Sequence, residues 1–194
     1  MRVSRERAAE NRDRIIDVAS RLFRERGFDG IGVAGLMQAA GLTHGGFYGH
    51  FESKCDLEAQ ACARALARSI ERWEALTASA AEAPLDALLD SYLSGRHRDG
   101  TGEGCIFAAL AADVARQGNP TLRHRFTEGL RASLDALARL VPGRTKAARR
   151  EQALVRLAGM IGALVLARAV DDPAYSDEIL AAARGALGRD RPFD

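Results

Sequence analysis

The chain has 194 residues, of which 47% are hydrophobic and 6% aromatic, and its formal net charge is +2. This length allows one large domain or two small ones with a real core, and the Ala- and Leu-rich composition favours an all-helical protein. A charge so close to neutral does not by itself indicate a nucleic-acid partner. Residues 1–54 nevertheless carry nine Lys or Arg against seven Asp or Glu, so the N-terminal end is the more basic one.

Residue usage argues against a metal centre and against export. Cys55, Cys62 and Cys105 have no CxxC spacing, so neither a zinc site nor a disulfide framework is predicted. His97 and His124 are scattered, and we expect no cofactor, no metal and no catalytic constellation. No apolar run approaches the ~18 residues of a membrane span, and the charged N-terminus lacks a signal-peptide core. We therefore expect a cytoplasmic protein without a membrane partner.

The first predicted helix covers residues 4–26. Ser4 can cap its start, an apolar stripe at helical spacing from Ile15 to Phe23 faces inward, and Gly27 ends it. Arg2, Arg5 and Arg7 precede or open this helix. They either add phosphate or minor-groove contacts or form a solvated charged end.

Two short helices around a tight turn follow. The first covers residues 33–40, and Gly41 ends it in the left-handed conformation that glycine adopts cheaply. Thr43 is predicted to cap a second helix that begins at His44, through its hydroxyl. This arrangement predicts a helix-turn-helix whose second helix reads DNA, although a helix-turn-helix that binds only protein is an alternative.

The second short helix has two different faces. Phe47 and Phe51 lie four residues apart on an apolar face, whereas Thr43, His44 and Tyr48 lie on the polar one. Gly45 and Gly46 each cost a helix about 1 kcal/mol relative to Ala, and close approach to another molecule would explain them. After this helix, Ser53 caps the next one in an S-x-x-D box that leaves Lys54 beside free backbone N–H groups, where a phosphate could sit.

The sequences LFRERGF at residues 22–28 and AAGLTHGGFYGHFESKCDL at residues 39–57 resemble the pattern of the tetracycline-repressor (TetR) family of transcriptional regulators at nearly every position. The resemblance covers about the first third of the chain. It departs from the family at Ile31 and Gly32, where a Thr and a Ser usually open the second helix.

The resemblance implies a repressor that binds a palindromic double-stranded DNA operator as a homodimer and is released by a small-molecule inducer. Thr43, Tyr48 and Lys54 would hold phosphates, and His44, Gly45 and Gly46 would approach base edges. His50 resembles a partly buried histidine of the family, for which a packing or phosphate-orienting role is expected.

The remaining chain is predicted to be helical over residues 53–80, 84–97, 105–117, 120–140 and 145–170, and in a last helix that starts at Pro173 or Ser176 and ends at Leu187, separated by Gly and Pro signals. The glycine-rich segment from Asp99 to Gly104 is predicted to be a mobile loop. In total we predict an all-α fold of about nine helices. Residues 1–52 would form the three-helix DNA-binding domain, and residues 53–194 a helical ligand-binding and dimerisation domain.

Two sets of apolar residues in the second domain are assigned roles. An inducer cavity would be lined by Trp73, Leu89, Tyr92, Cys105, Phe107, Leu110 and Phe126, most of which are also ordinary core candidates. A dimer interface of the last two helices would use Leu154, Leu157, Ala158, Ile161, Leu164, Val165, Leu180 and Ala183. The alternative is that these two helices only close the core of one protomer.

Cys105 supplies a second possible sensing mechanism. It follows the glycine-rich segment at a helix start, where the helix dipole favours a thiolate. A repressor that senses electrophiles or oxidants through Cys105 is therefore an alternative, although a small buried core cysteine is the more common case. A helical enzyme or scaffold is the remaining alternative, and no nucleophile–base pair or phosphate loop supports it.

Overall fold

The computed structural model describes residues 5–189, so Arg2 and Ser4 lie outside the described residues. The N-terminal unit contains α1 (Arg5–Arg26), α2 (Val33–Ala39) and the 3₁₀ helix η1 (His44–Gly49). The rest contains α3 (Lys54–Ser79), α4 (Pro84–Tyr92), α5 (Gly95–Asp99), the 3₁₀ turn η2 (Thr101–Glu103), α6 (Ile106–Gln117), α7 (Pro120–Ala138), α8 (Lys146–Ala169) and α9 (Pro173–Leu187). Residues 5–189 contain no strand, and the predicted all-α fold class is confirmed.

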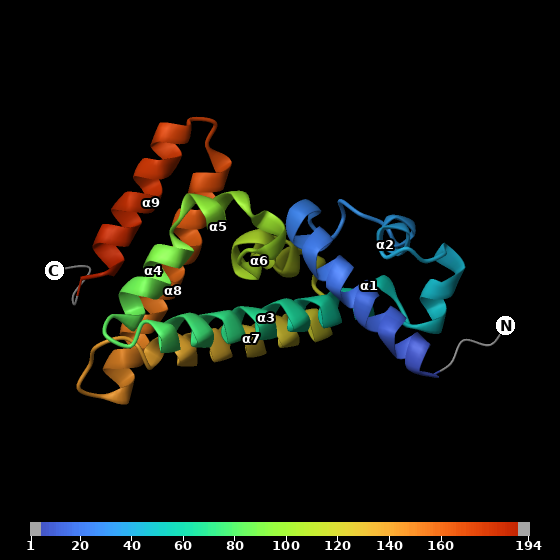
Figure 1. The fold of residues 1–194 in the computed structure, drawn as a ribbon, viewed down its shortest axis with the longest axis horizontal. Helices are drawn as coiled ribbons and strands as arrows, with labels where there is room; N and C mark the ends of the chain where they lie inside the picture. Colours follow the sequence, from blue (N-terminus) through green and yellow to red (C-terminus); the bar gives the residue numbers. More distant parts are fainter. Residues whose placement is uncertain (1–4, 190–194) are drawn as a thin grey trace.

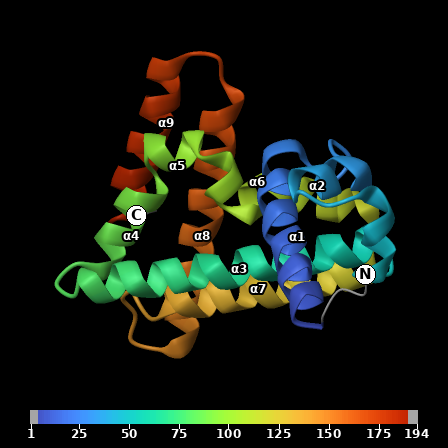
Figure 2. The same ribbon diagram turned by 45° about the vertical axis from the view of Figure 1, so that its right-hand side comes forward.

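The long pair α3 and α7 forms the axis of the molecule. The two helices run side by side in both ribbon views (Figures 1 and 2). The start of α3 lies beneath α1, and its far end lies beneath α4. Because Gly129 of α7 has no side chain, Leu66 of α3 packs directly against it, where a Cβ would come within 2.2 Å of Leu66 Cδ1. The close contact makes α3 a stiff connection between the N-terminal unit and the helices that follow.

Helix ends follow the signals in the sequence. Gly27, Gly41 and Gly118 take φ values of +73°, +71° and +66° after α1, α2 and α6, respectively, in the region where other residues are strained. The Ser53 hydroxyl accepts a 3.1 Å hydrogen bond from the Asp56 N–H and so caps α3 as predicted. These stops fix the directions in which successive helices leave each turn.

The helix predicted over residues 84–97 is wrong as a single element. It ends at Tyr92, and a separate short helix α5 begins after Ser94, whose hydroxyl accepts a 3.2 Å hydrogen bond from the His97 N–H. A serine followed by Gly95 competes with helix continuation because its hydroxyl can satisfy the free N–H groups of a new helix start. The break turns α5 across the end of α8 (Figure 1).

The last two helices pack against each other, and α8 also packs against α7. Arg156 of α8 is fully buried, and its guanidinium donates to the carbonyl oxygens of Leu187, at 2.9 Å, and Arg189, so it fixes the end of α9. By length and composition α8 passes the test for a membrane-crossing helix, with a mean hydropathy of 1.4 over the best window. Arg156 and Arg168 nevertheless interrupt its apolar sequence, so α8 contains no uninterrupted apolar run of that length. Its buried Arg156 and its packing on α7 and α9 are features of a core helix.

Candidate nucleic-acid interface

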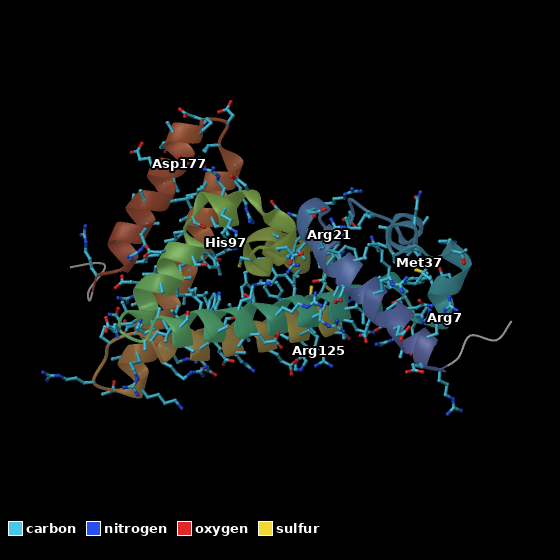
Figure 3. All side chains as sticks on the ribbon, in the orientation of Figure 1. Arg7, Arg21, Met37, His97, Arg125 and Asp177 are labelled. Carbon is cyan, nitrogen blue, oxygen red and sulfur yellow. The ribbon has the colours of Figure 1, made fainter. Side chains whose placement is uncertain are left out.

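The 3₁₀ helix η1, which is predicted to contact DNA, packs on buried aromatic side chains. Phe47 is fully buried and Phe51 nearly so, with ring centroids 5.5 Å apart, and both pack with Met37 of α2. The label in Figure 3 marks Met37 on the inner side of this unit. Arg12 of α1 lies over the Phe51 ring at 5.3 Å and donates a 2.6 Å hydrogen bond to Gln60 of α3. Three helices therefore hold η1 in place.

The opposite face of η1 is open, as predicted. Thr43, His44 and Gly45 are exposed, and Tyr48 is 71% exposed, the largest exposed fraction among the large hydrophobic side chains of the described residues. A Cβ placed on Gly45 would meet no atom within 4 Å. Packing within the chain therefore does not require glycine there, and the absence of a side chain matters only toward a partner.

The geometry of η1 differs from the prediction in two ways. It is a 3₁₀ helix, with a 3.0 Å hydrogen bond from the Gly46 N–H to the Thr43 carbonyl, because its three glycines give an α-helix little stability. The Thr43 side chain makes no capping hydrogen bond. Its exposed hydroxyl therefore remains available to another partner.

Lys54 does not lie as predicted. Its ammonium points inward, where it donates to the Phe28 carbonyl and lies 3.7 Å from the carboxylate of buried Glu58. The expectation of a lysine free to hold a phosphate is therefore not met in this structure. The reason is that α3 begins against the turn after α1, where a carbonyl and a buried carboxylate compete for the charge.

His50 and Gly46 lie at the edges of the exposed face and are half-buried. His50 ends η1, and its ring lies beside Phe51 at a centroid distance of 6.3 Å, which fits the expected packing role. Gly32 starts α2 without a side-chain cap, and Ile31 is buried, with its Cγ1 3.2 Å from a Cβ placed on Gly35. The departure at these two positions thus removes a polar cap and adds an apolar contact.

Ion pairs join α1 of the N-terminal unit to α3. Arg64 of α3 bonds to Asp13 and Asp17 of α1 at 2.6 Å each, and Arg68 bonds to Asp17 at 2.9 Å. Each exposed pair is worth little alone, but a network of several charges on two rigid helices fixes their orientation. Tilting of α3 would therefore carry α1 with it.

The residues predicted for the inducer site gather in one aromatic core between α3, α4, α6 and α7. Trp73 meets Tyr92 edge to face at 6.2 Å, and Phe107 meets Phe126 at 5.0 Å. Leu89, Leu110 and Cys105 are buried in the same cluster, whereas Trp73 and Phe126 are half-buried. Trp73 borders a surface hollow of about 320 Å³ between α3 and α7.

The expected mobile loop and thiolate at Cys105 are not found. Residues 99–104 form the end of α5 and the turn η2, which packs on α1, so that a Cβ on Gly102 would lie 2.3 Å from Glu25 Oε1. Cys105 is 7% exposed. Burial raises the pKa of its thiol and outweighs the Tyr92 hydroxyl and the backbone N–H groups at the start of α6, which act to lower it.

The predicted dimer residues divide into two groups. Leu157, Leu164 and Leu180 are buried inside the protomer, so their assignment to an exposed interface is wrong. They face the seam between α8 and its neighbours. Leu154, Ala158 and Val165 are exposed, and Ile161 and Ala183 are half-buried. Leu166 and Tyr175, which were not predicted, extend the exposed apolar set at 57% and 52% exposure.

Sequence reasoning also missed several buried charged residues. Arg24, Glu58 and Arg156 are 6%, 2% and 0% exposed. Arg24 follows buried Ser20 by four residues, and Arg156 precedes buried Met160 by four, so the helical period places both on inward faces. The charge of each side chain favoured a surface position, because burying a guanidinium is costly unless carbonyls or carboxylates accept hydrogen bonds from it.

Comparison with known proteins gives one consistent family. Residues 15–61 match the model of "Bacterial regulatory proteins, tetR family". Over 56 residues the chain is 41% identical to the HTH-type transcriptional regulator AcrR of Shigella flexneri, a match that spans 29% of this chain and 26% of that protein.

Solved structures extend the likeness in fold over nearly the whole chain. The reduced form of E. coli NemR has 24% identity and a TM-score of 0.76, with 92% of this chain and 96% of that chain covered. A TetR transcriptional regulator from Chloroflexus aurantiacus has 25% identity and a TM-score of 0.74, with 94% of each chain covered. The helices after residue 61 therefore follow the same architecture as those two structures.

Proposed function

Since the chain belongs to the TetR family of bacterial regulatory proteins, we propose that it is a ligand-responsive transcriptional repressor. It would bind a palindromic DNA operator as a homodimer and be released by a small-molecule inducer. The observation that carries this proposal is the exposed polar face of η1, with Tyr48 at its centre, on a fully buried Phe47 support. A rigid support beneath exposed polar groups is what base and phosphate contacts require.

The DNA contacts divide by chemistry. The Thr43 and Tyr48 hydroxyls would donate to phosphate oxygens, and His44 would reach base edges where Gly45 and Gly46 let the backbone approach the major groove. Lys54 would act indirectly: its ammonium joins α3 to the turn after α1 and so positions η1. The division of the chain into a DNA-binding domain of residues 1–52 and a second domain of residues 53–194 is part of the same proposal.

Dimerisation would cover the exposed apolar face of α8 and α9. Leu154, Ala158 and Val165 continue along one side of α8, and no atom lies within 4 Å of a Cβ placed on Gly162. A two-fold axis would bring two such faces together in a four-helix bundle. This burial would give exposed apolar side chains such as Leu166 a partner.

The DNA-binding test uses the purified protein in a filter-binding assay with duplexes from the DNA flanking its own gene. We expect specific retention of one such duplex, with affinity that falls steeply from low to moderate salt because phosphate contacts release counterions. Affinity that does not change with salt, or no specific duplex, would contradict the proposal.

The dimer test compares two charged substitutions by sedimentation velocity. Leu166→Glu, on the exposed side of α8, should yield monomers, because two carboxylates would be buried across the axis. Leu130→Glu on α7, at an exposed position 37% accessible to solvent, is the matched control and should remain dimeric. A monomeric wild type would contradict this part of the proposal.

The alternatives from the sequence have less support. A sensor at Cys105 requires a reactive thiolate, and the thiol is buried with a raised pKa. An enzyme or scaffold is disfavoured because the matched relatives are regulators. A regulator that binds DNA would act in the cytoplasm, where its operator lies.

A further inference from the structure

A group of buried polar atoms without partners lies where the DNA-binding unit meets the second domain. Arg24 Nε and Arg168 Nη1 are each shut off from solvent and have no hydrogen-bond partner within the described part of the chain, and the equally buried Tyr92 hydroxyl has only the neighbouring thiol of Cys105 beside it. Arg24 comes from α1, Tyr92 from α4 and Arg168 from α8. Leaving a buried donor unpaired is costly, and more so for a charged group, so these donors gathered in one place require an explanation.

These groups surround the thiol of Cys105. Cys105 interacts electrostatically with Arg24, Tyr92 and Arg168, and its own N–H donates a 2.9 Å hydrogen bond to His97 Nε2. The remaining nitrogens of Arg168 donate to the carbonyl oxygens of His97, at 2.8 Å, and Arg98, at 2.9 Å. These hydrogen bonds fix the Arg168 side chain and leave its Nη1 without a partner.

Arg24 is a buried cation with other arginines near it. The residue is 6% exposed and lies in the field of Arg68 and Arg72, with Glu103 as the largest opposing charge. Glu103 is itself exposed. A buried cation of this kind is costly unless an anion reaches it, since desolvation of a guanidinium is repaid only by a paired and hydrogen-bonded charge.

The segment from Gly100 to Gly104 covers the group and is flanked by two hollows. One, of about 530 Å³, is lined by Arg168 and Arg98 and lies toward α8 and α9. The other, of about 400 Å³, is lined by Arg21 and Glu25 and lies toward α1. Figure 3 shows the labelled Arg21 and His97 on opposite sides of α6, the helix that this segment leads into. A small molecule could enter from either hollow if the segment moved.

We propose that this site binds a small carboxylate-bearing molecule, with Arg24 and Arg168 as its cationic partners and the Tyr92 hydroxyl as a further donor. A carboxylate is planar, accepts up to four hydrogen bonds and suits the fork of a guanidinium. The aromatic pair of Tyr92 and Trp73, 6.2 Å apart, would adjoin the apolar body of such a ligand. The inference deepens the proposed function, because it names the chemical class of the inducer.

The position of Arg24 would connect ligand binding to DNA binding. Arg24 lies one turn before the Gly27–Phe28 corner on α1, which the charged pairs of Arg64 and Arg68 join to α3. A carboxylate between α1 and α8 would pull on a helix of the DNA-binding unit itself. It would thus favour one orientation of that unit over others, which is the differential affinity that allosteric release requires.

The test uses the fluorescence of Trp73, the single tryptophan of the chain. Benzoate, acetate and inorganic phosphate are titrated into the purified full-length protein at millimolar concentration and constant ionic strength, with benzamide as the uncharged analogue of benzoate. We expect benzoate to change the emission saturably and to raise Tm, acetate to bind more weakly, and benzamide and phosphate to have no effect. Equal effects of benzamide and benzoate, binding of phosphate alone, or no effect of either carboxylate would overturn the proposal.

Two substitutions and one control locate the site. Arg24→Gln and Arg168→Gln should each weaken benzoate binding at least about tenfold, as loss of a charge-assisted hydrogen bond predicts. Arg24→Lys, which keeps the charge, should retain part of it. Arg131→Gln, at an exposed arginine of α7, should bind like the wild type, and loss of binding there would overturn the assignment.

A second readout needs no ligand. Without an anion, Arg24→Gln should be at least as stable as the wild type in urea, because it removes a buried cation that lacks a bonded partner. A clearly less stable Arg24→Gln would assign Arg24 a structural role and overturn the proposal. The operator-binding assay tests the proposed function separately. If the protein binds its operator and carboxylates have no effect, only this inference is overturned. If carboxylates bind and no operator is bound, only the proposed function is overturned.

Discussion

Asp113 and Phe28 join the two parts of the molecule through one hydrogen bond. The Asp113 carboxylate on α6 accepts it from the Phe28 N–H over 3.2 Å, directly after α1. The same oxygen lies 2.9 Å from the place of a Cβ on Gly27, which has a φ of +73°. Helix α6 can therefore reach the corner only because residue 27 is glycine. The corner also holds Lys54, which donates to the Phe28 carbonyl.

Replacement of Asp113 should weaken the connection between α6 and the turn after α1. Asp113→Ala leaves a partly buried N–H unpaired and should lower the free energy of unfolding by about 1 kcal/mol, the typical net value of such a bond. It should also reduce the change in DNA affinity that an inducer causes, since α6 would no longer hold the corner. Urea unfolding and operator titrations with and without the inducer measure the two effects.

The matched control is Arg116→Ala, because Arg116 bonds to the other oxygen of Asp113 and is 72% exposed. An exposed pair contributes little, so this variant should resemble the wild type in both assays. Full inducer response in Asp113→Ala would show that the coupling uses another route.

Substitution of two neighbouring aromatic residues of η1 should affect DNA binding and stability separately. Tyr48→Ala should leave Tm nearly unchanged, because the side chain is 71% exposed, and should weaken binding to all duplexes by a similar factor, as a phosphate contact would. Phe47→Ala removes a fully buried ring and should cost about 3–5 kcal/mol of stability. Thermal melts and filter binding on the two variants check this, and a Tyr48→Ala protein with full operator affinity would remove Tyr48 from the interface.

The sequence could predict the helices but not the directions of charged side chains. The stops at Gly27, Gly41 and Gly118 and the cap at Ser53 depend on local backbone chemistry, which a short window of sequence contains. The inward turn of Lys54 depends on Phe28 and Glu58, and Arg24 lies on a helix that packs against the turn η2, a segment far along the chain. Such contacts arise only when distant segments meet.

The candidate interface was predictable for the same reason. Thr43, His44, Gly45 and Tyr48 lie within one turn region, so a local pattern places them on one face. The residues of the proposed dimer interface were only partly predictable. Helix α8 is apolar on most of its surface, so the spacing of its apolar residues does not distinguish the face that packs on α7 and α9 from the outer face. Leu157 and Leu164 face inward, and Leu154 and Val165 face outward.

Glu58 should make stability depend on pH. Burial raises the pKa of its carboxyl above the ordinary 4.5, helped by Asp29, while Lys54 acts in the opposite direction. Below pH 4.5 the group is protonated in both the folded and the unfolded chain and costs nothing. As the pH rises through the folded-state pKa, the charge must be held in a buried site and stability is lost.

Glu58→Gln should therefore be more stable than the wild type at neutral pH, and the difference should vanish below about pH 4.5. Urea unfolding across this range measures the difference, with Glu71→Gln, at an exposed position of the same helix, as the control. A Glu58→Gln protein that is less stable at neutral pH would mean that the pair with Lys54 outweighs the cost of burial.

The three cysteines should react in the order of their exposure, which tests the sensor hypothesis. A thiolate is the nucleophile, so reaction rate depends on access and on pKa. Cys55 is exposed, whereas Cys105 is buried with a raised pKa, and burial raises the pKa of Cys62 to about 12. A mild electrophile should therefore label Cys55 first and Cys105 slowly in the folded protein, as mass spectrometry of the peptides over time would show.

Operator release by that reagent should be equal in wild type and Cys105→Ser, because a thiol enclosed by Tyr92, His97 and Arg168 must wait for the covering segment to open. If Cys105 were labelled before Cys55 and release were lost in Cys105→Ser alone, the electrophile-sensing mechanism would replace reversible ligand binding as the signal.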